Sequence, residues 1–214
     1  MRVLLVVVAL GGCFLKPERH PHDSDAHPSG DGTIADGITS DGNRTPNRMF
    51  VTSGAFALGG TLGAGAYMKA EFFCNNAAMH ATPPVPGQYL PWLSYDGFGA
   101  ADALRAKGAR AWVRLDDLPI GDTVDDLCDG MLMNTPSRDE NNNAINPASG
   151  VHVMTGTTRL GGSDGGGASC GTANIQTGVP TDMDFNWTEN GPNSCLTTTL
   201  RLYCFGVDRD GLLP

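Results

Sequence analysis

The sequence predicts an α+β domain, and three observations support this class. Apolar residues recur at helical spacing early in the chain, at residues 64–81 and 99–107. Short apolar segments that suit strands are spread over the remainder. The chain also has 29 glycines and a hydrophobic content of 40%, which indicates long loops between few regular elements. Early helices followed by dispersed strands are typical of the α+β class.

The first half of the expected domain contains one strand, a long helix and a short buried segment. Residues 49–52 form an apolar strand candidate, and a glycine-rich loop follows at 54–63. The helix is expected over 64–81, where Pro83 and Pro84 end it. Its apolar positions at helical spacing are Ala66, Ala70, Phe73, Cys74 and Ala77. Residues 89–94 form the buried segment, in which Trp92 is expected in the core.

The second half is expected to contain one short helix and three strands. The helix lies within 99–107 and ends at Gly108. Strands are expected at 111–115, which places Trp112 in the core, at 151–154 and at 200–205. The intervening stretches 116–150 and 158–198 are mostly polar and are expected to be loops.

The N-terminus has the pattern of a bacterial export signal. A basic start and eight apolar residues, Val3 to Leu10, precede small residues, and eight are too few to span a bilayer. Leu10-Gly11-Gly12-Cys13 resembles the lipobox of lipoprotein signals, which implies removal of residues 1–12 and lipidation of Cys13. The alternatives are an ordinary cleaved signal and a buried first strand. Phe14 follows in place of an acidic residue, which favours an outer-membrane or cell-surface location over the inner membrane.

Residues 13–47 are expected to be a disordered tether that carries the lipid. Proline, glycine, aspartate, serine and histidine dominate this stretch, which includes three short Asp-Gly repeats between 31 and 45. A flexible linker of about 30 residues spans roughly 30 Å. The folded domain is then expected at 48–207, with a C-terminal tail at 208–214.

Charge and cysteine content limit the partners. The net charge of −9 disfavours nucleic acid and anionic lipid, so the only membrane contact expected is the lipid anchor. Apart from Cys13, five cysteines remain, and outside the cytoplasm cysteines normally pair. Because five is odd, at least one lacks a partner within the chain or bonds another chain.

Several segments in order and at similar spacing resemble a bacterial family of unknown function that has an endostatin-like version of the C-type lectin fold. The resemblance spans residues 48–206. The segments that carry it are Phe50-Val51-Thr52-Ser53, residues 70–78, Trp92-Leu93-Ser94, Ala100-Ala101-Asp102, Val113-Arg114, Thr155-Gly156-Thr157, Cys170, Cys195 and Arg201-Leu202-Tyr203-Cys204-Phe205. It implies two helices with a small mixed, mainly antiparallel sheet and long loops.

The resemblance also implies a cysteine pairing. In lectin-like domains a helix cysteine joins the final strand and a second bridge closes a late loop, which here gives Cys74–Cys204 and Cys170–Cys195. Cys128 is then left over. Carboxylates beside it in the sequence are expected to make this thiol unreactive. It is interpreted as a small buried residue, with an intermolecular bridge as the alternative.

Acidic residues and one tryptophan are the candidate ligand-binding groups. One acidic cluster contains Asp116, Asp117, Asp122, Asp125, Asp126 and Asp129. A second surrounds Trp187 and includes Asp184, Glu189 and Asn190, in the late region where sugar-binding C-type lectins hold calcium. The paired calcium-ligand motifs of those lectins are missing, so the expectation is no metal and no cofactor, with calcium as the alternative. Trp187 is either a core residue or an exposed ring for stacking on a sugar.

The function expected from these features is non-catalytic binding of a glycan, an envelope polymer or a protein. It depends on fold analogy, because no nucleophile constellation is recognised in the sequence. One alternative is a structural envelope or assembly component whose loops contact only protein. Another is a hydrolase that uses a pair of carboxylates, which requires two such groups facing one another across a cleft.

Overall fold

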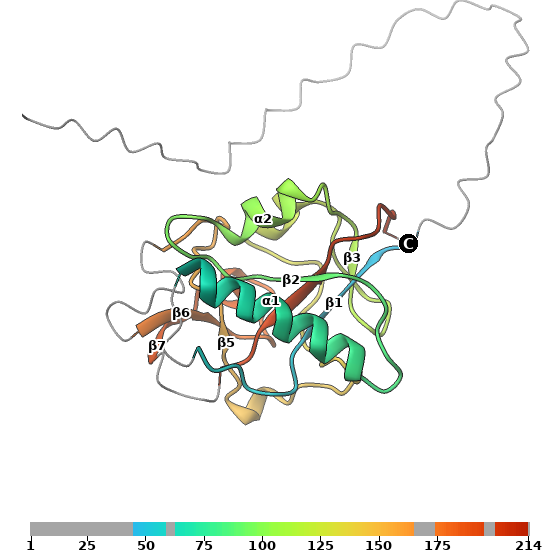
Figure 1. Cartoon of the computed structure of the whole chain (residues 1–214), viewed down its shortest axis with the longest axis horizontal. Coiled ribbons are helices and arrows are strands. Elements are labelled where there is room, and N and C mark those ends of the chain that lie inside the picture. Colours follow the sequence, from blue (N-terminus) through green and yellow to red (C-terminus); the bar gives the residue numbers. More distant parts are fainter. Residues whose placement is uncertain (1–44, 59–62, 165–173, 195–199, 214) are drawn as a thin grey trace, which may run out of the picture.

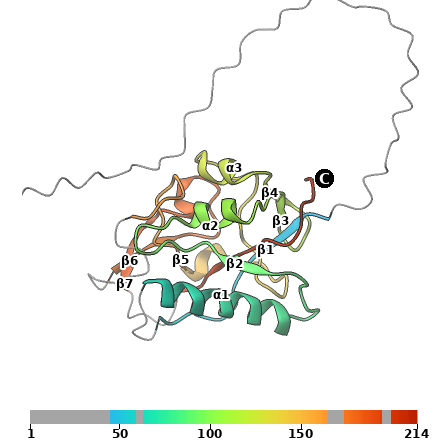
Figure 2. The same ribbon diagram turned by 45° about the horizontal axis from the view of Figure 1, so that its top comes forward.

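The computed structural model describes residues 45–58, 63–164, 174–194 and 200–213. Within these residues the fold is α+β, as predicted. It has three α-helices in place of the two that the resemblance implies, and two sheets in place of one: a five-stranded mixed sheet and a three-stranded antiparallel sheet. A long helix lies across one face of the larger sheet (Figure 1). The smaller sheet lies at the opposite end of the domain from β3 (Trp112–Val113) and β4 (Pro119–Gly121) of the larger one (Figure 2).

The five-stranded sheet contains both the first and the last strand of the domain. Its strands are β1 (Asn47–Val51), β2 (Tyr89–Pro91), β3 (Trp112–Val113), β4 (Pro119–Gly121) and β8 (Tyr203–Gly206), in the order β2-β8-β1-β3-β4. β1 pairs antiparallel with β8, with Phe50 opposite Cys204, and parallel with β3. The first and last strands therefore lie side by side in the centre of the sheet.

The second sheet is entirely antiparallel and contains β5 (Val153–Met154), β6 (Asn174–Gly178) and β7 (Gly191–Ser194). It connects to the segment that leads into β8, because the amide of Met154 donates to the carbonyl of Arg201 at 2.8 Å. The late part of the chain is thus attached to the central sheet through backbone hydrogen bonds.

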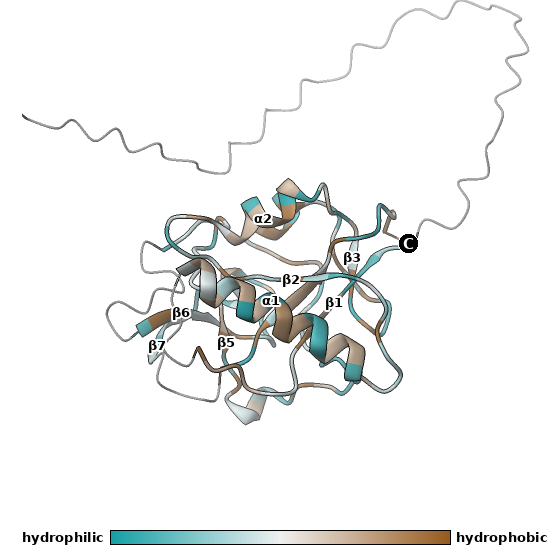
Figure 3. Cartoon of the chain, viewed as in Figure 1, coloured by the Kyte–Doolittle hydropathy of each residue, from teal (hydrophilic) through white to brown (hydrophobic). Residues whose placement is uncertain are grey.

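Helix α1 (Gly63–His80) covers the larger sheet with a face of small residues. Ala66, Ala70, Cys74 and Ala78 recur every four residues and are buried. The Cys74–Cys204 disulfide joins this face to β8 across 130 residues of sequence. The opposite face of α1 exposes Met68, Phe72 and Met79, and Figure 3 shows hydrophobic and hydrophilic residues mixed along this helix.

Two shorter helices lie on the opposite side of the larger sheet from α1 (Figure 2). They are α2 (Ala100–Ala106) and α3 (Val124–Cys128). Thr123 and Asp126 form a reciprocal capping box at the start of α3, in which Asp126 Oδ2 accepts from the Thr123 amide at 2.8 Å. This cap allows a helix of a single turn to form within a stretch that has no helical periodicity.

A cluster of aromatic rings fills the core between the two sheets. Trp92, Trp112 and Phe205 are fully buried, with ring centroids 5.6–5.7 Å apart for the two pairs that involve Phe205. The indole nitrogen of Trp112 donates to the carbonyl of Gly206 at 2.9 Å. The predicted core positions of Trp92 and Trp112 are therefore confirmed.

The described parts of the two stretches predicted to be mostly polar loop are mostly irregular, but they also contain short elements that were not predicted. β4 and α3 lie within 116–150, and β6, β7 and the 3-10 helix η3 (Phe185–Trp187) lie within 158–198. β7 has the sequence Gly-Pro-Asn-Ser, which carries no strand pattern. It forms because β6 supplies its hydrogen-bonding partners, and this pairing is invisible in local sequence.

The domain extends beyond the boundaries predicted at 48 and 207. Asn47 begins β1, and its side-chain oxygen accepts from the amide of Arg209 at 3.1 Å. Gly211 is buried against Thr45, where a Cβ would lie 2.4 Å from the Thr45 carbonyl oxygen. The C-terminal segment therefore packs against the start of the domain. In the described ranges no helix combines the length and the apolar character that crossing a membrane requires.

Candidate functional site

The candidate site is a hollow of about 320 Å³ at the end of the domain where the first and last described segments meet. Five separate segments contribute to it: β1, the loop after α1, the turn after β3, the turn at 139–143 and the C-terminal segment. Its lining residues are Arg48, Pro83, Pro84, Val85, Pro86, Leu115, Glu140, Asn141, Asn142 and Arg209. The hollow therefore combines an apolar wall with two guanidinium groups, two amides and one carboxylate.

Prolines form the wall because they follow directly on the C-terminal end of α1. The amide of Val85 donates to the carbonyl of Ala78 at 2.9 Å, which folds the segment back against the helix. The hydroxyl of Tyr89 donates to the carbonyl of Pro86 at 3.2 Å. Since each proline has a fixed φ, this wall has little backbone freedom to lose on binding.

The amides come from a tight turn that the Asp139 side chain organises. Asp139 Oδ1 accepts from the backbone amides of Asn141 and Asn143, at 2.9 and 2.8 Å. The Asn141 side-chain oxygen in turn accepts from the amide of Thr82 at 2.9 Å. This bond joins the turn that carries Asn141 and Asn142, here called the amide rim, to the proline wall. The two sides of the hollow are therefore held at a fixed distance from each other.

Glu140 is the one acidic side chain among the described residues that line the hollow. Its Oε2 accepts from the backbone amide of Ser53 at 2.6 Å, and its Oε1 accepts from the hydroxyl of Ser53. Both carboxylate oxygens therefore hold the segment that follows β1. This bonding makes Glu140 a structural link between the turn at 139–143 and the segment that follows β1.

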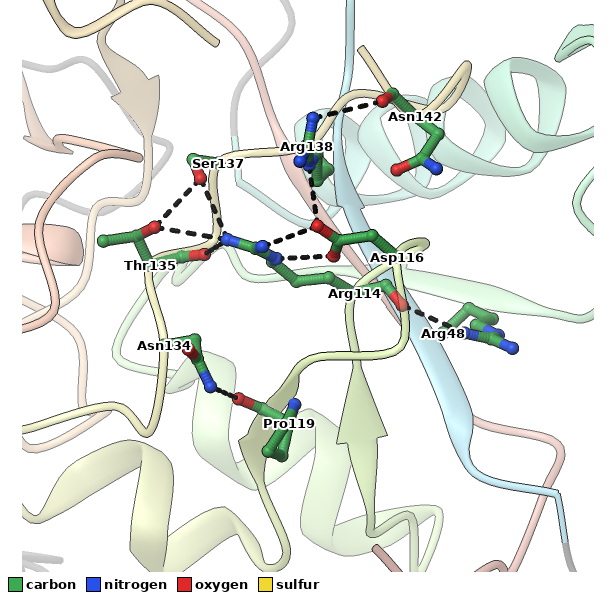
Figure 4. A network of polar contacts seen from close by, with 9 residues as sticks. All are labelled: Arg48, Arg114, Asp116, Pro119, Asn134, Thr135, Ser137, Arg138 and Asn142. Atoms are coloured by element: carbon green, nitrogen blue, oxygen red, sulfur yellow. Dashed lines mark hydrogen bonds and ion pairs between the residues drawn. The ribbon is translucent and has the colours of Figure 1, made fainter. Parts of the chain in front are cut away.

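A network of arginine and carboxylate side chains joins segments that lead to the hollow (Figure 4). The Arg114 guanidinium forms a bidentate pair with Asp116, with N–O distances of 2.8 and 2.7 Å, and Arg138 Nε donates to the same carboxylate at 2.9 Å. The remaining nitrogen of Arg114 donates to the carbonyl of Thr135 and to the hydroxyl of Ser137. Arg114 thus joins the turn after β3 to residues 135–138, which lead into the amide rim.

The pKa of Asp116 lies below its usual value. Burial acts to raise this pKa, but the hydrogen bonds and positive charges of Arg114 and Arg138 outweigh it. The network therefore favours the ionised carboxylate in the folded state.

We expect Asp116 to make the stability of the protein depend on pH in the acid range. Because its pKa is lower in the folded than in the unfolded chain, its contribution is complete above the unfolded value of about 4 and is lost as the pH falls below it. Urea unfolding of the protein and of Asp116→Asn at pH 7, 4 and 3 checks this. The variant should be less stable at pH 7 and should lose less stability on acidification. Equal losses in the two proteins would contradict the assignment.

The first acidic cluster does not form a common site. Its members pair with arginines on different segments: Asp116 with Arg114 and Arg138, Asp117 with Arg48, Asp122 with Arg110, and Asp125 with Arg105. Asp126 caps α3, and Asp129 Oδ1 accepts from the amide of Met131 at 3.1 Å. The sequence cluster is thus dispersed into ion pairs and caps.

The residues of the second cluster have separate structural roles. Asp184 caps η3 by accepting from the amide of Asn186 at 2.9 Å. Glu189 Oε2 accepts from the amide of Arg159 at 2.6 Å, and Asn190 is exposed with its backbone amide bonded to Thr177. Across the described ranges, no group of three or more His, Cys, Asp or Glu side chains is arranged to hold a metal.

Trp187 is a core residue, and its proposed role as an exposed stacking ring is wrong. Its side chain is 0% exposed and packs on Trp92 and Tyr203, with centroid distances of 5.0 and 5.4 Å. The Tyr203 hydroxyl donates to the Trp187 carbonyl at 2.7 Å. Gly178 permits this approach, because a Cβ there would lie 1.8 Å from the same carbonyl oxygen. The polar residues beside Trp187 in the sequence suggested an exposed ring, but the 3-10 helix η3 directs the side chain into the core.

The structure confirms one of the two predicted disulfides. Cys74 and Cys204 are bonded. Cys13, Cys170 and Cys195 lie outside the described residues. Cys128 is 2% exposed, and its sulfur lies beneath Gly161, where a Cβ would be 2.7 Å from it. Such burial agrees with a small core residue and disfavours an intermolecular bridge.

Comparison with known proteins gives no assignment: no family model matches the chain, and no curated protein matches it significantly. The endostatin-like resemblance stays a prediction. The functional argument therefore depends on the geometry of the hollow.

Sequence reasoning missed the residues of the hollow. Pro83 and Pro84 were interpreted only as the end of a helix, and Arg209 was placed in a tail. No local pattern connects residues 48, 83–86, 140–142 and 209, because they meet only through the sheet pairing of β1 and the packing of the C-terminal segment.

Proposed function

We propose that the chain is an extracytoplasmic lipoprotein, anchored through lipid at Cys13 at the outer membrane or cell surface. Its single C-type-lectin-like domain binds a glycan, an envelope polymer or a protein without catalysing a reaction. The lipid anchor is supported by the lipobox-like residues 10–13 and by the polar tether that follows them.

The lectin-like fold is supported by three features of the domain. A disulfide joins the long helix to the last strand, and the first and last strands pair at the centre of one sheet. A second antiparallel sheet formed from the late part of the chain agrees with the same fold. Fold alone is a weak argument for function, so the binding role depends on the site.

The observation that carries the binding role is the composition of the hollow. Rigid prolines and two arginines face a volume of about 320 Å³, at the lower end of the range for small-ligand sites. Such walls bind a small group through apolar contact and charge-assisted hydrogen bonds without bond making. The hydrolase alternative needs two facing carboxylates, whereas Glu140 is the sole acidic side chain among the described lining residues.

The binding role is tested with the full chain carrying Cys13→Ser, so that no lipid is attached. Binding to a panel of glycans, envelope polymers and peptides is measured with calcium and with chelator. We expect at least one class to bind, and Arg209→Ala to weaken that binding by about tenfold, the value of one charge-assisted hydrogen bond. A folded protein that binds no member of the panel, or binding unaffected by Arg209→Ala, would remove this site from the proposal.

An exposed apolar surface favours the structural alternative. The segments around Met131 and Asp184 run side by side, since the amide of Leu132 donates to the carbonyl of Met183 at 2.8 Å. Met131, Met133, Met183 and Phe185 are exposed there. Methionine-rich surfaces suit protein contacts. If the domain assembles through this surface, Met131→Ser with Phe185→Ser should abolish self-association measured by sedimentation, whereas a monomeric parent protein would count against it.

A further inference from the structure

Arg209 is the principal cation of the hollow. Its Nη1 and Nη2 donate to the carbonyls of Pro46 and Pro86 at 3.4 and 3.2 Å. Among the described residues no carboxylate lies within 4.0 Å of its guanidinium nitrogens. Asp208 does not line the hollow, and its carboxylate lies toward Gly87. The two weak hydrogen bonds to carbonyl groups hold the guanidinium in position. Its positive charge has no counterion within the described part of the domain.

Arg48 is the second cation and is only partly occupied. Its Nη1 donates to the carbonyl of Arg114 at 3.0 Å and to Asp117, whose side chain is 75% exposed. Within the described residues, its Nε and Nη2 have no hydrogen-bond partner. The guanidinium of this lining residue is therefore held through one nitrogen, and its other two nitrogens are available to a ligand.

The remaining lining consists of apolar side chains, two amides and Glu140, whose two carboxylate oxygens both accept from Ser53. Pro83, Pro84, Val85 and Leu115 offer apolar contact with no hydroxyl or carboxyl group, which suits an aliphatic side chain. Asn142 contributes an amide that both donates and accepts, as a peptide backbone requires. The small volume limits the occupant to about one residue with a short side chain.

We infer that the hollow binds the free C-terminal carboxylate of a peptide whose last side chain is small and apolar. Arg209 and Arg48 bind the carboxylate, and the proline wall contacts the last side chain. The net charge of −9 repels anions elsewhere on the chain, so a local pair of arginines selects for one anionic group in place of an extended polyanion. This inference rests on the proposed binding function and specifies its ligand.

The test uses the full chain carrying Cys13→Ser and a matched pair of probes. N-acetyl-Ala-Ala-Ala with a free carboxylate is titrated by calorimetry or NMR, beside the same peptide with a C-terminal amide. We expect the acid to bind at least about tenfold more tightly than the amide, because a hydrogen bond to a charged group contributes about 1.5–3 kcal/mol. The preference should decrease as salt is raised, since the hollow is open to solvent.

Variants locate the binding. Arg209→Gln should weaken acid binding by about tenfold and leave the affinity for the amide unchanged. Arg48→Gln should act in the same direction and provides a second variant if Arg209→Gln does not fold. Arg159→Gln is the control, because Arg159 is an exposed arginine outside the hollow and should bind both peptides like the parent.

The outcomes separate this inference from the proposed function. Equal affinity for acid and amide, or acid binding unaffected by both arginine variants, overturns the carboxylate assignment. If the folded protein binds neither peptide but binds a glycan in a manner that depends on Arg209, the peptide inference fails and the binding function stands. If it binds neither peptides nor any member of the wider panel, both fail.

Discussion

Removal of the Cys74–Cys204 disulfide should lower the free energy of unfolding by about 5 kcal/mol, on the chain-entropy model for a loop of this length. The bridge joins residues 130 apart and connects α1 to the central strand β8. Without it, the unfolded chain regains the freedom of most of the domain. The measurement is urea unfolding of the Cys74→Ala, Cys204→Ala double variant against the parent protein, monitored by circular dichroism.

A matched variant distinguishes loop closure from a general effect of cysteine loss. Replacement of Cys170 and Cys195 by alanine, if these residues pair as predicted, opens a loop of only about 25 residues and should cost about 3.5 kcal/mol on the same model. The double variant at Cys74 and Cys204 should therefore be the less stable of the two. A loss below about 1 kcal/mol at Cys74 and Cys204 would show that the packing of α1 holds the fold without the bridge.

Trp187→Ala should destabilise the domain by about 3–5 kcal/mol, the range for truncating a large buried aromatic side chain. The ring is fully buried between Trp92, Tyr203 and Phe205. Its loss leaves a cavity where the two sheets meet. The adjacent Tyr203 hydroxyl lies in the same packed region, where burial raises its pKa. Thermal and urea unfolding measure the loss.

Two further variants define the cause. Trp187→Phe should cost less than Trp187→Ala because part of the ring volume is kept. Phe72→Ala removes an aromatic ring from the exposed face of α1 and should change stability by no more than about 0.5 kcal/mol. If Trp187→Ala were as stable as the parent yet lost ligand binding, the ring would be a contact residue and the core assignment would be wrong.

Elements with strong local patterns were predictable from sequence. The helix expected at 64–81 is found at Gly63–His80, and the strand expected at 49–52 is found at Asn47–Val51. Periodic alanines and a proline stop locate the helix, because both act within a few residues. β4, β6 and β7 were missed, since such short strands gain their stability from partners distant in sequence.

The site was less predictable than the fold. Acidic residues adjacent in sequence suggested a ligand cluster, but the structure separates Asp116, Asp122 and Asp125 onto different arginines. Trp187 lay among polar residues yet is buried. Both errors have the same cause. Neighbours in sequence do not determine where a side chain points, because packing against distant segments sets the orientation of each segment.

By itself the sequence determined the α+β class, the long alanine-lined helix, the core positions of Trp92 and Trp112, and the pairing of Cys74 with Cys204 through a family resemblance. These depend on periodicity, hydrophobicity and ordered motifs, which are written locally. Tertiary structure alone decided that β1 lies between β8 and β3 and that Arg48, the proline segment and Arg209 face one hollow. Such contacts arise from the joint burial of distant segments, whose free energy no single stretch of sequence contains.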